Sequence, residues 1–290
     1  MKLVRFGAQN QERPGVWLDN MPTPGQASIL DVRAMAFDME DYNAHFFATH
    51  GLERLRALLH ESQLKLTSAA DIRLGPPIAR PGKIICLGKN YAAHAAEFDS
   101  EIPSTPIFFS KATTALNGPF DPIVLPRGAR RVDGEAELAV IIGRTACHVT
   151  EADAHDVIAG YTILNDVTDR DAQRDGKQWF RGKSADTFCP LGPFLVTRDE
   201  VPHPHHLRIT QRVNNQLLQD DYTGQMLFKI PFLIAFLSAT ITLEPGDIIA
   251  TGTPAGIGSA RQPPVLLRAG DTVEIAVENL GVQRSPVVAA

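Results

Sequence analysis

The sequence predicts an α+β fold rich in β-strands, with a small α/β domain at the N-terminus. Short apolar runs alternate with turn residues from 124 to 194, a pattern typical of strands. Helical spacing is confined to a few scattered segments, so a regular series of alternating strands and helices is not expected. Proline and glycine cluster between Gly75 and Gly82, which favours a boundary there. We therefore assign residues 1–74 to a small N-terminal domain and 75–290 to a second, larger domain.

The N-terminal segment predicts two strand pairs around one helix. Residues 1–19 alternate as a hairpin, with Arg13-Pro14-Gly15 as its turn. Apolar residues then recur at helical spacing between Asp41 and Leu59. Further short strands are expected near Leu64 and Ile72.

The larger segment opens on residues 83–88, an apolar run that predicts a buried strand. It leads into residues 90–98, whose composition favours a helix. The remaining expected elements are strands over 106–111, within 204–217, over 247–251 and over 272–277, and a short buried helix over 231–239 with proline in its first turn.

Composition limits the class of partner. The net charge of −5 and pI of about 6.0 indicate neither a nucleic-acid surface nor an anionic-membrane surface. The longest apolar stretch, 226–243, is interrupted by Lys229 and Pro231 and is too short to span a bilayer. No signal-peptide pattern opens the chain. We expect a cytoplasmic protein that binds a small molecule.

The three cysteines, Cys86, Cys147 and Cys189, lie in apolar contexts and lack metal-binding spacing. They are expected to be buried thiols in a reducing compartment.

Three carboxylates stand out as candidate metal ligands. Glu135 and Glu137 open a β-branched apolar run, and residues two apart on a strand point to the same face. Asp166 follows the apolar run 157–164 and can supply a third carboxylate. An oxygen-only set of this kind suits Mg²⁺, Mn²⁺ or Ca²⁺ rather than Zn²⁺. The alternative is an edge strand that shows its glutamates to solvent, with Asp166 as a helix N-cap.

His94 and Glu97 are candidates for acid–base chemistry. Three residues apart on a helical turn, they share one face. A carboxylate beside a histidine fixes its tautomer and raises its basicity, as a general base requires. A surface ion pair would give the same spacing.

Other motifs do not support their usual functions. Gly182-Lys183-Ser184 lacks the upstream glycine of a phosphate-binding loop, because position 177 is lysine. Residues 252–258 follow a strand without opening a clear helix, so a tight loop around Thr253 that presents N–H groups to an anion is preferred over a dinucleotide site. His203, His205 and His206 lie among prolines and are expected in a solvated loop.

Taken together, the segments resemble the fumarylacetoacetate hydrolase family from about Pro81 to the C-terminus. The similarity rests on six segments in order: Gly88-Lys89-Asn90-Tyr91 with His94 and Glu97; Phe109-Ser110-Lys111; Asp133-Gly134-Glu135-Ala136-Glu137; Asn165-Asp166-Val167-Thr168 with Arg170, Asp171 and Gln173; Arg181-Gly182-Lys183-Ser184; and residues 252–258. Gly134 departs from the family, where a larger residue is frequent, as does Asn214-Asn215, where Asn-Gly is common.

The resemblance implies a mixed β-sandwich roll around a divalent metal, Mg²⁺ or Mn²⁺, in a homodimer. It places the metal carboxylates on Glu135, Glu137 and Asp166, the His–Glu dyad on His94 and Glu97, and a lysine near the metal on Lys183. It also implies that the N-terminal segment is an accessory domain found in some members.

Residues and resemblance together suggest hydrolysis of a C–C bond in a 2,4-diketo acid, such as an acylpyruvate or a 2,4-diketo-3-deoxy sugar acid. His94 would activate water, and Lys183 or the Thr253 loop would stabilise the oxyanion. Substrate oxygens would contact Lys111, Arg170 and Gln173. The alternatives on the same centre are oxaloacetate decarboxylation and hydroxymuconate-type isomerisation, followed by ureidoglycolate lyase activity or a non-catalytic metal-binding role.

Overall fold

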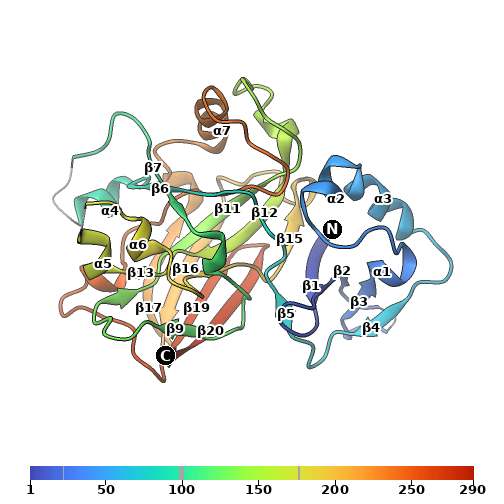
Figure 1. Cartoon of the computed structure of the whole chain (residues 1–290), viewed down its shortest axis with the longest axis horizontal. Helices are drawn as coiled ribbons and strands as arrows, with labels where there is room; N and C mark the ends of the chain where they lie inside the picture. Colours follow the sequence, from blue (N-terminus) through green and yellow to red (C-terminus); the bar gives the residue numbers. More distant parts are fainter. Residues whose placement is uncertain (22, 98–100, 176) are drawn as a thin grey trace.

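The computed structural model describes residues 1–21, 23–97, 101–175 and 177–290. A mixed sheet of eleven strands runs through this part of the chain, in the order β4-β3-β2-β1-β15-β12-β11-β18-β6-β7, with β5 also paired to β1 (Figure 1). The strands are β1 Lys2–Phe6, β2 Arg13–Leu18, β3 Ser28–Asp31, β4 Leu66–Ser68, β5 Leu74–Gly75, β6 Ile84–Gly88, β7 Ile107–Lys111, β11 Ala136–Ile142, β12 Ile158–Asn165, β15 Leu195–Thr197 and β18 Ile248–Ala250.

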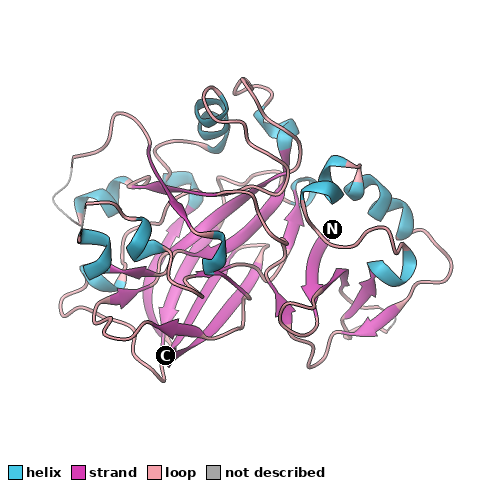
Figure 2. Cartoon of the chain, in the orientation of Figure 1, coloured by secondary structure: helices cyan, strands magenta, loops and turns pink. Residues whose placement is uncertain are grey.

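A second, five-stranded sheet packs against the middle of the first. Its order is β17-β16-β19-β20-β9, with bounds Gln216–Tyr222, Arg208–Val213, Thr272–Val277, Gly281–Ala289 and Ile123–Leu125. Two small pairs complete the strands: β10 Val132–Asp133 with β13 Thr168–Asp169, and β8 Leu116–Asn117 with β14 Cys189–Pro190. Strands therefore dominate the molecule, and the predicted β-rich α+β fold is confirmed (Figure 2).

Strand β11 is buried on both faces, and after Glu137 its residues, 138–142, are apolar without alternation. Leu138, Val140 and Ile142 join the core that includes Ile275 of the second sheet. Ala139 and Ile141 point the other way, into a core that includes Leu3 from the N-terminal segment. This strand and its antiparallel neighbour β12 carry the candidate metal ligands at one end.

Helices are short and lie around the sheets. Helices α1–α3 accompany the N-terminal strands, α4–α6 lie together at the far end of the molecule, and α7 projects at the top of the view (Figure 1). Their bounds are α1 Val32–Met35, α2 Ala44–Ala48, α3 Gly51–Leu58, α4 Ala92–Ala96, α5 Arg170–Arg174, α6 Phe180–Lys183 and α7 Ile230–Ser238, with 3₁₀ turns η1 Thr113–Ala115, η2 Ala154–Val157, η3 Arg198–Glu200, η4 Thr223–Gln225 and η5 Gly258–Ala260.

The N-terminal segment continues the large sheet. Strand β1 lies between β2 and β15, with Leu3 opposite Leu195. The assignment of residues 1–74 and 75–290 to separate domains stays a prediction. Within the described residues, none of the helices has the length and apolar character needed to cross a bilayer.

Several local predictions were wrong for identifiable reasons. Arg13-Pro14-Gly15 lies inside β2. The hairpin turn precedes this segment and begins at Gly7, which has a φ of +116°. The single helix expected over 41–59 is two helices, because His50 adopts a left-handed conformation with φ of +58°. Helix α4 is shorter than the expected 90–98, and Phe98 lies outside the described residues. Cys147 is exposed, whereas Cys86 and Cys189 are buried as expected.

Candidate active site

The three predicted metal ligands meet where β11 begins and β12 ends. The antiparallel register pairs Ala136 with Asn165, so Glu135 and Asp166 are neighbours across the strands, and the Asp166 amide donates to the Glu135 carbonyl over 2.9 Å. Glu135, Glu137 and Asp166 each offer a carboxylate oxygen within 4.8 Å of the others. All three side chains are buried. The predicted clustering of these carboxylates is therefore confirmed, while their role as ligands stays a prediction.

Buried cations surround two of the carboxylates. Lys183 Nζ donates to Glu135 Oε2 over 2.8 Å and to Asp166 Oδ2 over 2.5 Å. Lys111 Nζ donates to Asp166 Oδ1 over 2.6 Å. Arg170 donates from Nη2 to Glu135 Oε1 over 2.7 Å. These contacts balance the charge of Glu135 and Asp166 in a buried site.

Glu137 differs from its neighbours. Its Oε2 accepts a hydrogen bond from the Gly252 amide over 2.8 Å, and no lysine or arginine among the described residues forms an ion pair with it. Burial, together with the negative charges of Asp166 and Glu135, raises the pKa of Glu137 well above its ordinary value. Burial also raises the pKa of Glu135, but the charges of Lys183 and Arg170 outweigh this and hold it well below its ordinary range.

This arrangement fits a divalent cation. Three buried carboxylates form a hard oxygen donor set, and one of them lacks a cationic partner. A cation among them would relieve the repulsion that raises the pKa of Glu137. Glu135, Glu137 and Asp166 are thus the residues that would hold it.

The His94–Glu97 pair forms as predicted and is anchored to a neighbouring loop. His94 Nδ1 lies 2.9 Å from Glu97 Oε2, at the C-terminal end of α4. Glu97 Oε1 accepts from the Gly256 amide over 2.6 Å, where the glycine has φ of +104°. Both residues are partly or largely buried, so the pair is not a solvated surface contact.

The loop from Gly252 to Gly258 has a different role from the one expected. Its amides donate to protein carboxylates, Glu137 and Glu97, rather than pointing to a free anion site. The Thr253 hydroxyl donates to the Ala136 carbonyl over 2.9 Å and accepts from Gln219 Nε2 over 2.8 Å. The loop therefore fixes the ligands and the dyad relative to each other.

A pocket of about 210 Å³ joins these groups. Among the predicted site residues, His94, Glu135, Glu137, Arg170, Gln173, Lys183 and Thr253 line it. Asp166, Lys111 and Glu97 stand behind this lining and support it through the contacts above. Lys111 is fully buried against Asp166, so its geometry suits charge balance more than substrate binding.

Other residues at the site carry no strong sequence signal. Asp133 accepts from Arg170 Nε over 2.6 Å and from the Ser259 amide over 2.7 Å, which orients the arginine. Asn90 bonds both Phe228 and Thr251 and joins distant loops. Trp179 and Phe109 form an aromatic wall, with ring centroids 5.2 Å apart. Their clustering depends on tertiary packing, although Asp133 and Asn90 lie inside motifs that the sequence does highlight.

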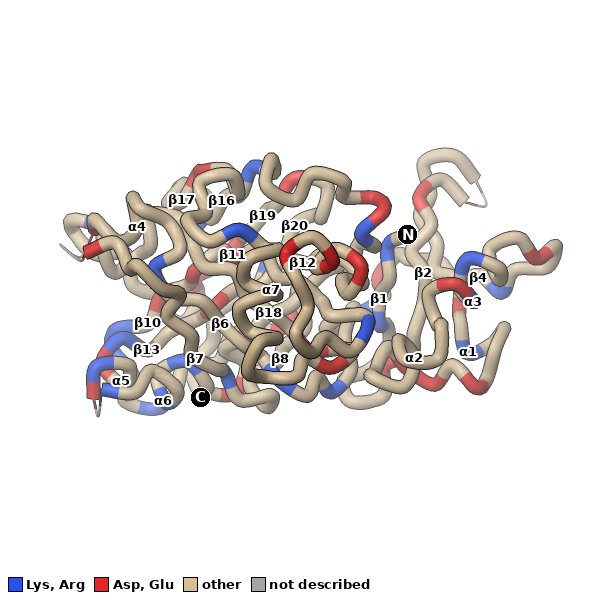
Figure 3. Tube along the Cα trace, turned by 90° about the horizontal axis from the view of Figure 1, so that it is seen from above, with Lys and Arg blue, Asp and Glu red and all other residues tan. Residues whose placement is uncertain are grey.

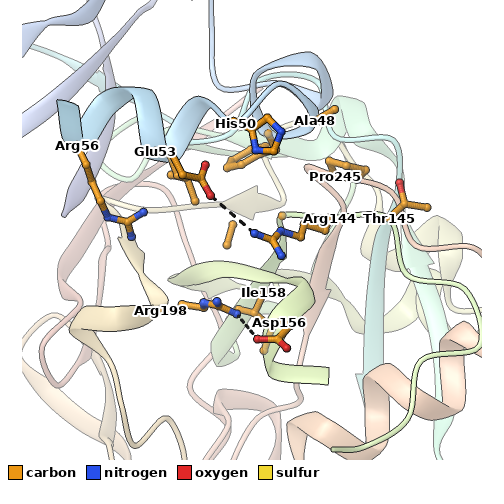
Figure 4. Close-up of a pocket in the computed structure, with 14 residues that line it drawn as sticks. Ala48, His50, Glu53, Arg56, Arg144, Thr145, Asp156, Ile158, Arg198 and Pro245 are labelled. Carbon is orange, nitrogen blue, oxygen red and sulfur yellow. Dashed lines mark hydrogen bonds and ion pairs between the residues drawn. The ribbon is translucent and has the colours of Figure 1, made fainter. Parts of the chain in front are cut away.

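A second pocket of about 350 Å³ lies at the opposite ends of β11 and β12 (Figure 4). Arg144 there lies 3.7 Å from Glu53 of α3, and Arg198 lies 3.3 Å from Asp156. The first of these pairs joins the N-terminal helix α3 to the end of β11, and the second joins η3 to η2. The pocket has neither a clustered carboxylate set nor a histidine–carboxylate pair among its described lining residues, so the chemistry is assigned to the smaller pocket.

Comparison with known proteins points to one family. Residues 83–288 match the family model described as fumarylacetoacetate (FAA) hydrolase C-terminal. The chain is 42% identical over 291 residues to the oxaloacetate tautomerase Fahd2a, mitochondrial, of Rattus norvegicus, covering 99% of this chain and 92% of the relative.

Solved structures resemble the whole chain. Maleylpyruvate hydrolase from Sphingobium sp. SYK-6, in complex with manganese(II) and pyruvate, is 34% identical with a TM-score of 0.81, covering 100% of both chains. The 5-carboxymethyl-2-hydroxymuconate delta-isomerase from Mycobacterium smegmatis is 36% identical with a TM-score of 0.78, covering 100% of this chain and 99% of that one.

Proposed function

Because the chain belongs to the fumarylacetoacetate hydrolase family, we propose that it is a divalent-metal-dependent enzyme that interconverts the keto and enol forms of oxaloacetate. The observation that carries this proposal is one pocket that holds a buried carboxylate triad, a lysine and a histidine–glutamate pair. The similarity to a rat protein named as an oxaloacetate tautomerase supports the choice of substrate.

Keto–enol exchange moves one proton between carbon and oxygen. His94, held by Glu97, would accept the proton from C3 of the keto form, and the C–H electron pair would move toward the C2 oxygen. Delivery of a proton to that oxygen completes the enol, and the reverse order restores the keto form. The Nδ1 contact with Glu97 orients the imidazole ring, which lines the pocket.

Lys183 would act as a fixed hydrogen-bond donor rather than as a base. Burial lowers its pKa, but Asp166 and Glu135 outweigh this and raise the pKa above its ordinary value. The ammonium therefore stays charged and can stabilise negative charge on the C2 oxygen. A bound Mg²⁺ or Mn²⁺ would supply further positive charge beside that oxygen.

C–C bond hydrolysis of an acylpyruvate is the second candidate. The similar Sphingobium maleylpyruvate hydrolase, solved with manganese(II) and pyruvate, supports it. The same His94 would then deprotonate a water that attacks the distal carbonyl. Decarboxylation and isomerisation also need stabilisation of negative charge on the substrate, but they need no attacking water.

The homodimer and the cytoplasmic location stay predictions, and the name of the rat relative places that protein in mitochondria.

The test begins with protein stripped by chelator and reloaded with Mg²⁺ or Mn²⁺. Enol absorbance of oxaloacetate reports tautomerisation, and pyruvate release from an acylpyruvate reports hydrolysis. We expect His94→Gln to lower kcat at least about 100-fold, with unchanged Mn²⁺ affinity. The exposed His206 provides the matched control, His206→Gln, with wild-type activity.

Two results would contradict the proposal. One is chelator-treated protein that equilibrates oxaloacetate as fast as the reloaded enzyme. The other is a His94→Gln variant with wild-type turnover. Pyruvate release without tautomerisation would favour the second candidate instead.

A further inference from the structure

We propose that Lys89 and Arg174 form a subsite for a second, distal carboxylate of the substrate. The pocket would then select dicarboxylic 2-oxo acids over monocarboxylic ones through these two side chains. This inference rests on the proposed function and assigns specificity residues to it.

The basic residues that line the pocket fall into two groups. Arg170 and Lys183 are buried, and each bonds two acceptors among Asp133, Glu135 and Asp166. Lys89 and Arg174 line the same pocket, yet within the described part of the chain their side chains form no hydrogen bond, ion pair or ring contact. The first pair has its charge satisfied by protein, whereas the second pair is free to bind an anion.

These two residues come from separate elements that converge at the mouth of the pocket. Lys89 directly follows β6 and is partly buried, and Arg174 ends α5 and is exposed. The carboxylate triad lies at the buried end. Figure 3 shows basic positions gathered along α5 and α6, beside this end of the sheet. The pocket thus runs from a metal-binding end to a cationic end.

The backbone at Lys89 argues against a merely solvated lysine. Its φ of +56° lies in the left-handed region, which is unfavourable for a non-glycine residue. The next residue, Asn90, is held by hydrogen bonds to Phe228 and Thr251, and these fix the turn. Strain that the surroundings maintain is typical of functional positions. Here the strained turn directs a lysine to the pocket.

The wall between the two ends is apolar. Trp179 packs against Phe109, and a Cβ at Gly88 would lie 2.6 Å from Trp179 Cζ3, so the backbone there approaches the ring closely. A pocket of about 210 Å³ with this wall suits a short carbon chain. A ligand with an anion at each end and a short chain between them complements every part of the lining.

The test compares oxaloacetate with 2-oxobutanoate, which has a methyl group in place of the distal carboxylate. Exchange of C3 protons for deuterium, followed by NMR and corrected for the uncatalysed rate, reports enolisation of both. We expect Lys89→Met and Arg174→Met each to raise KM for oxaloacetate about tenfold or more, because a charge-assisted hydrogen bond is lost. For 2-oxobutanoate, the kcat/KM of each variant should stay within twofold of the wild-type value, because this substrate has no distal carboxylate to bind.

Arg181→Met is the matched control. Arg181 lies on the neighbouring α6, is 73% exposed and pairs with Asp175, so its loss changes net charge equally without touching the pocket. A loss in Arg181→Met equal to that in Arg174→Met would overturn the subsite in favour of a long-range charge effect. The subsite would also be overturned if Lys89→Met and Arg174→Met lowered catalytic efficiency equally on both substrates, or changed it on neither.

A binding measurement separates this inference from the proposed function. Malate and 2-hydroxybutanoate are inert to enolisation and differ only in the distal carboxylate. Calorimetric titration of metal-loaded protein should show at least tenfold tighter binding of malate, and Lys89→Met should abolish the difference. If wild type fails to enolise oxaloacetate, the proposed function is wrong, while the malate preference still decides the subsite. Equal affinity for the two ligands would overturn it.

Discussion

Glu137 is the residue where the charge balance of the site is incomplete. Lys183, Arg170 and Lys111 neutralise Glu135 and Asp166, while Glu137 accepts from the Gly252 amide and forms no ion pair within the described residues. Repulsion between like charges at close range in a buried site is far stronger than in water. The simplest way to remove it is a cation bound among the three carboxylates, so Glu137 should govern metal affinity.

Glu137→Gln keeps the side-chain shape and removes the charge. We expect Mn²⁺ affinity to fall at least about 100-fold, because one of three anionic ligands is lost. In metal-free protein the free energy of unfolding should rise by about 1 kcal/mol, since a buried charge without a cationic partner is removed. Calorimetric Mn²⁺ titration and urea unfolding measure the two effects. Unchanged Mn²⁺ affinity would rule out Glu137 as a ligand. Glu97→Gln, in the dyad and outside the carboxylate triad, is the control that should leave Mn²⁺ affinity intact.

At the scale of elements, helix α7 was predicted from its own sequence, but part of what stabilises it comes from another segment. Its bounds, Ile230–Ser238, agree with the predicted 231–239, and Pro231 lies in the first turn. A residue outside the helix bonds its first backbone amide: His205 Nε2 accepts from the Ile230 amide over 3.2 Å. His205 is half-buried and not in a solvated loop, which corrects the interpretation of the histidine cluster for this residue. An accepting Nε2 requires a neutral ring.

This contact predicts a pH dependence of stability. Burial, followed by the charges of Lys229 and His206, lowers the pKa of His205 from 6.5 to about 4. The unfolded chain then binds more protons than the folded chain between these values, so stability present above about pH 6.5 is lost as the pH falls toward 4. His205→Ala should cost about 1 kcal/mol at pH 8, as the loss of a helix cap does.

Urea unfolding at pH 8 and pH 5 checks this prediction. The destabilisation by His205→Ala should be smaller at pH 5, where the wild type has begun to lose the contact. His206→Ala, at an exposed position whose ring stacks on His203, should leave stability within about 0.5 kcal/mol. A destabilisation by His205→Ala that is the same at both pH values would show that protonation is not involved.

Elements with local causes could be predicted from sequence, and elements with distant causes could not. The apolar runs of β6, β11 and β19 are visible because burial on a sheet needs them. The Glu135–Glu137 pair follows from strand periodicity, and the adjacency to Asp166 from antiparallel pairing. The aromatic wall at Trp179 depends on Phe109, a packing partner far away in the sequence. The role of the Gly252–Gly258 loop was misjudged because its acceptors, Glu97 and Glu137, come from other segments.

For the whole molecule, the question is what joins the N-terminal segment to the rest. Two exposed ion pairs cross the junction, Glu53 to Arg144 at 3.7 Å and Arg56 to Asp199 at 3.1 Å. All four side chains are at least 42% exposed, and such pairs contribute about 0–1 kcal/mol each. A more buried pair joins Arg73 to Asp121 at 2.6 Å, with side chains 26% and 14% exposed. Leu3 is fully buried in a core shared with Leu195 and Ile141, and burial of that kind contributes more. Apolar packing across the continuous sheet therefore dominates.

A single cooperative unfolding transition follows from this shared core. The chain has two tryptophans, Trp17 on β2 of the N-terminal segment and Trp179 beside the pocket, so each can be observed alone after replacement of the other by phenylalanine. We expect urea transitions at both probes to coincide, and Leu3→Ala to lower both midpoints together, by about 3 kcal/mol in unfolding free energy. Met21→Ala, at a residue 39% exposed, is the control and should shift neither. A Leu3→Ala variant in which Trp17 unfolds early while Trp179 keeps its wild-type midpoint would show that residues 1–74 unfold as a separate unit.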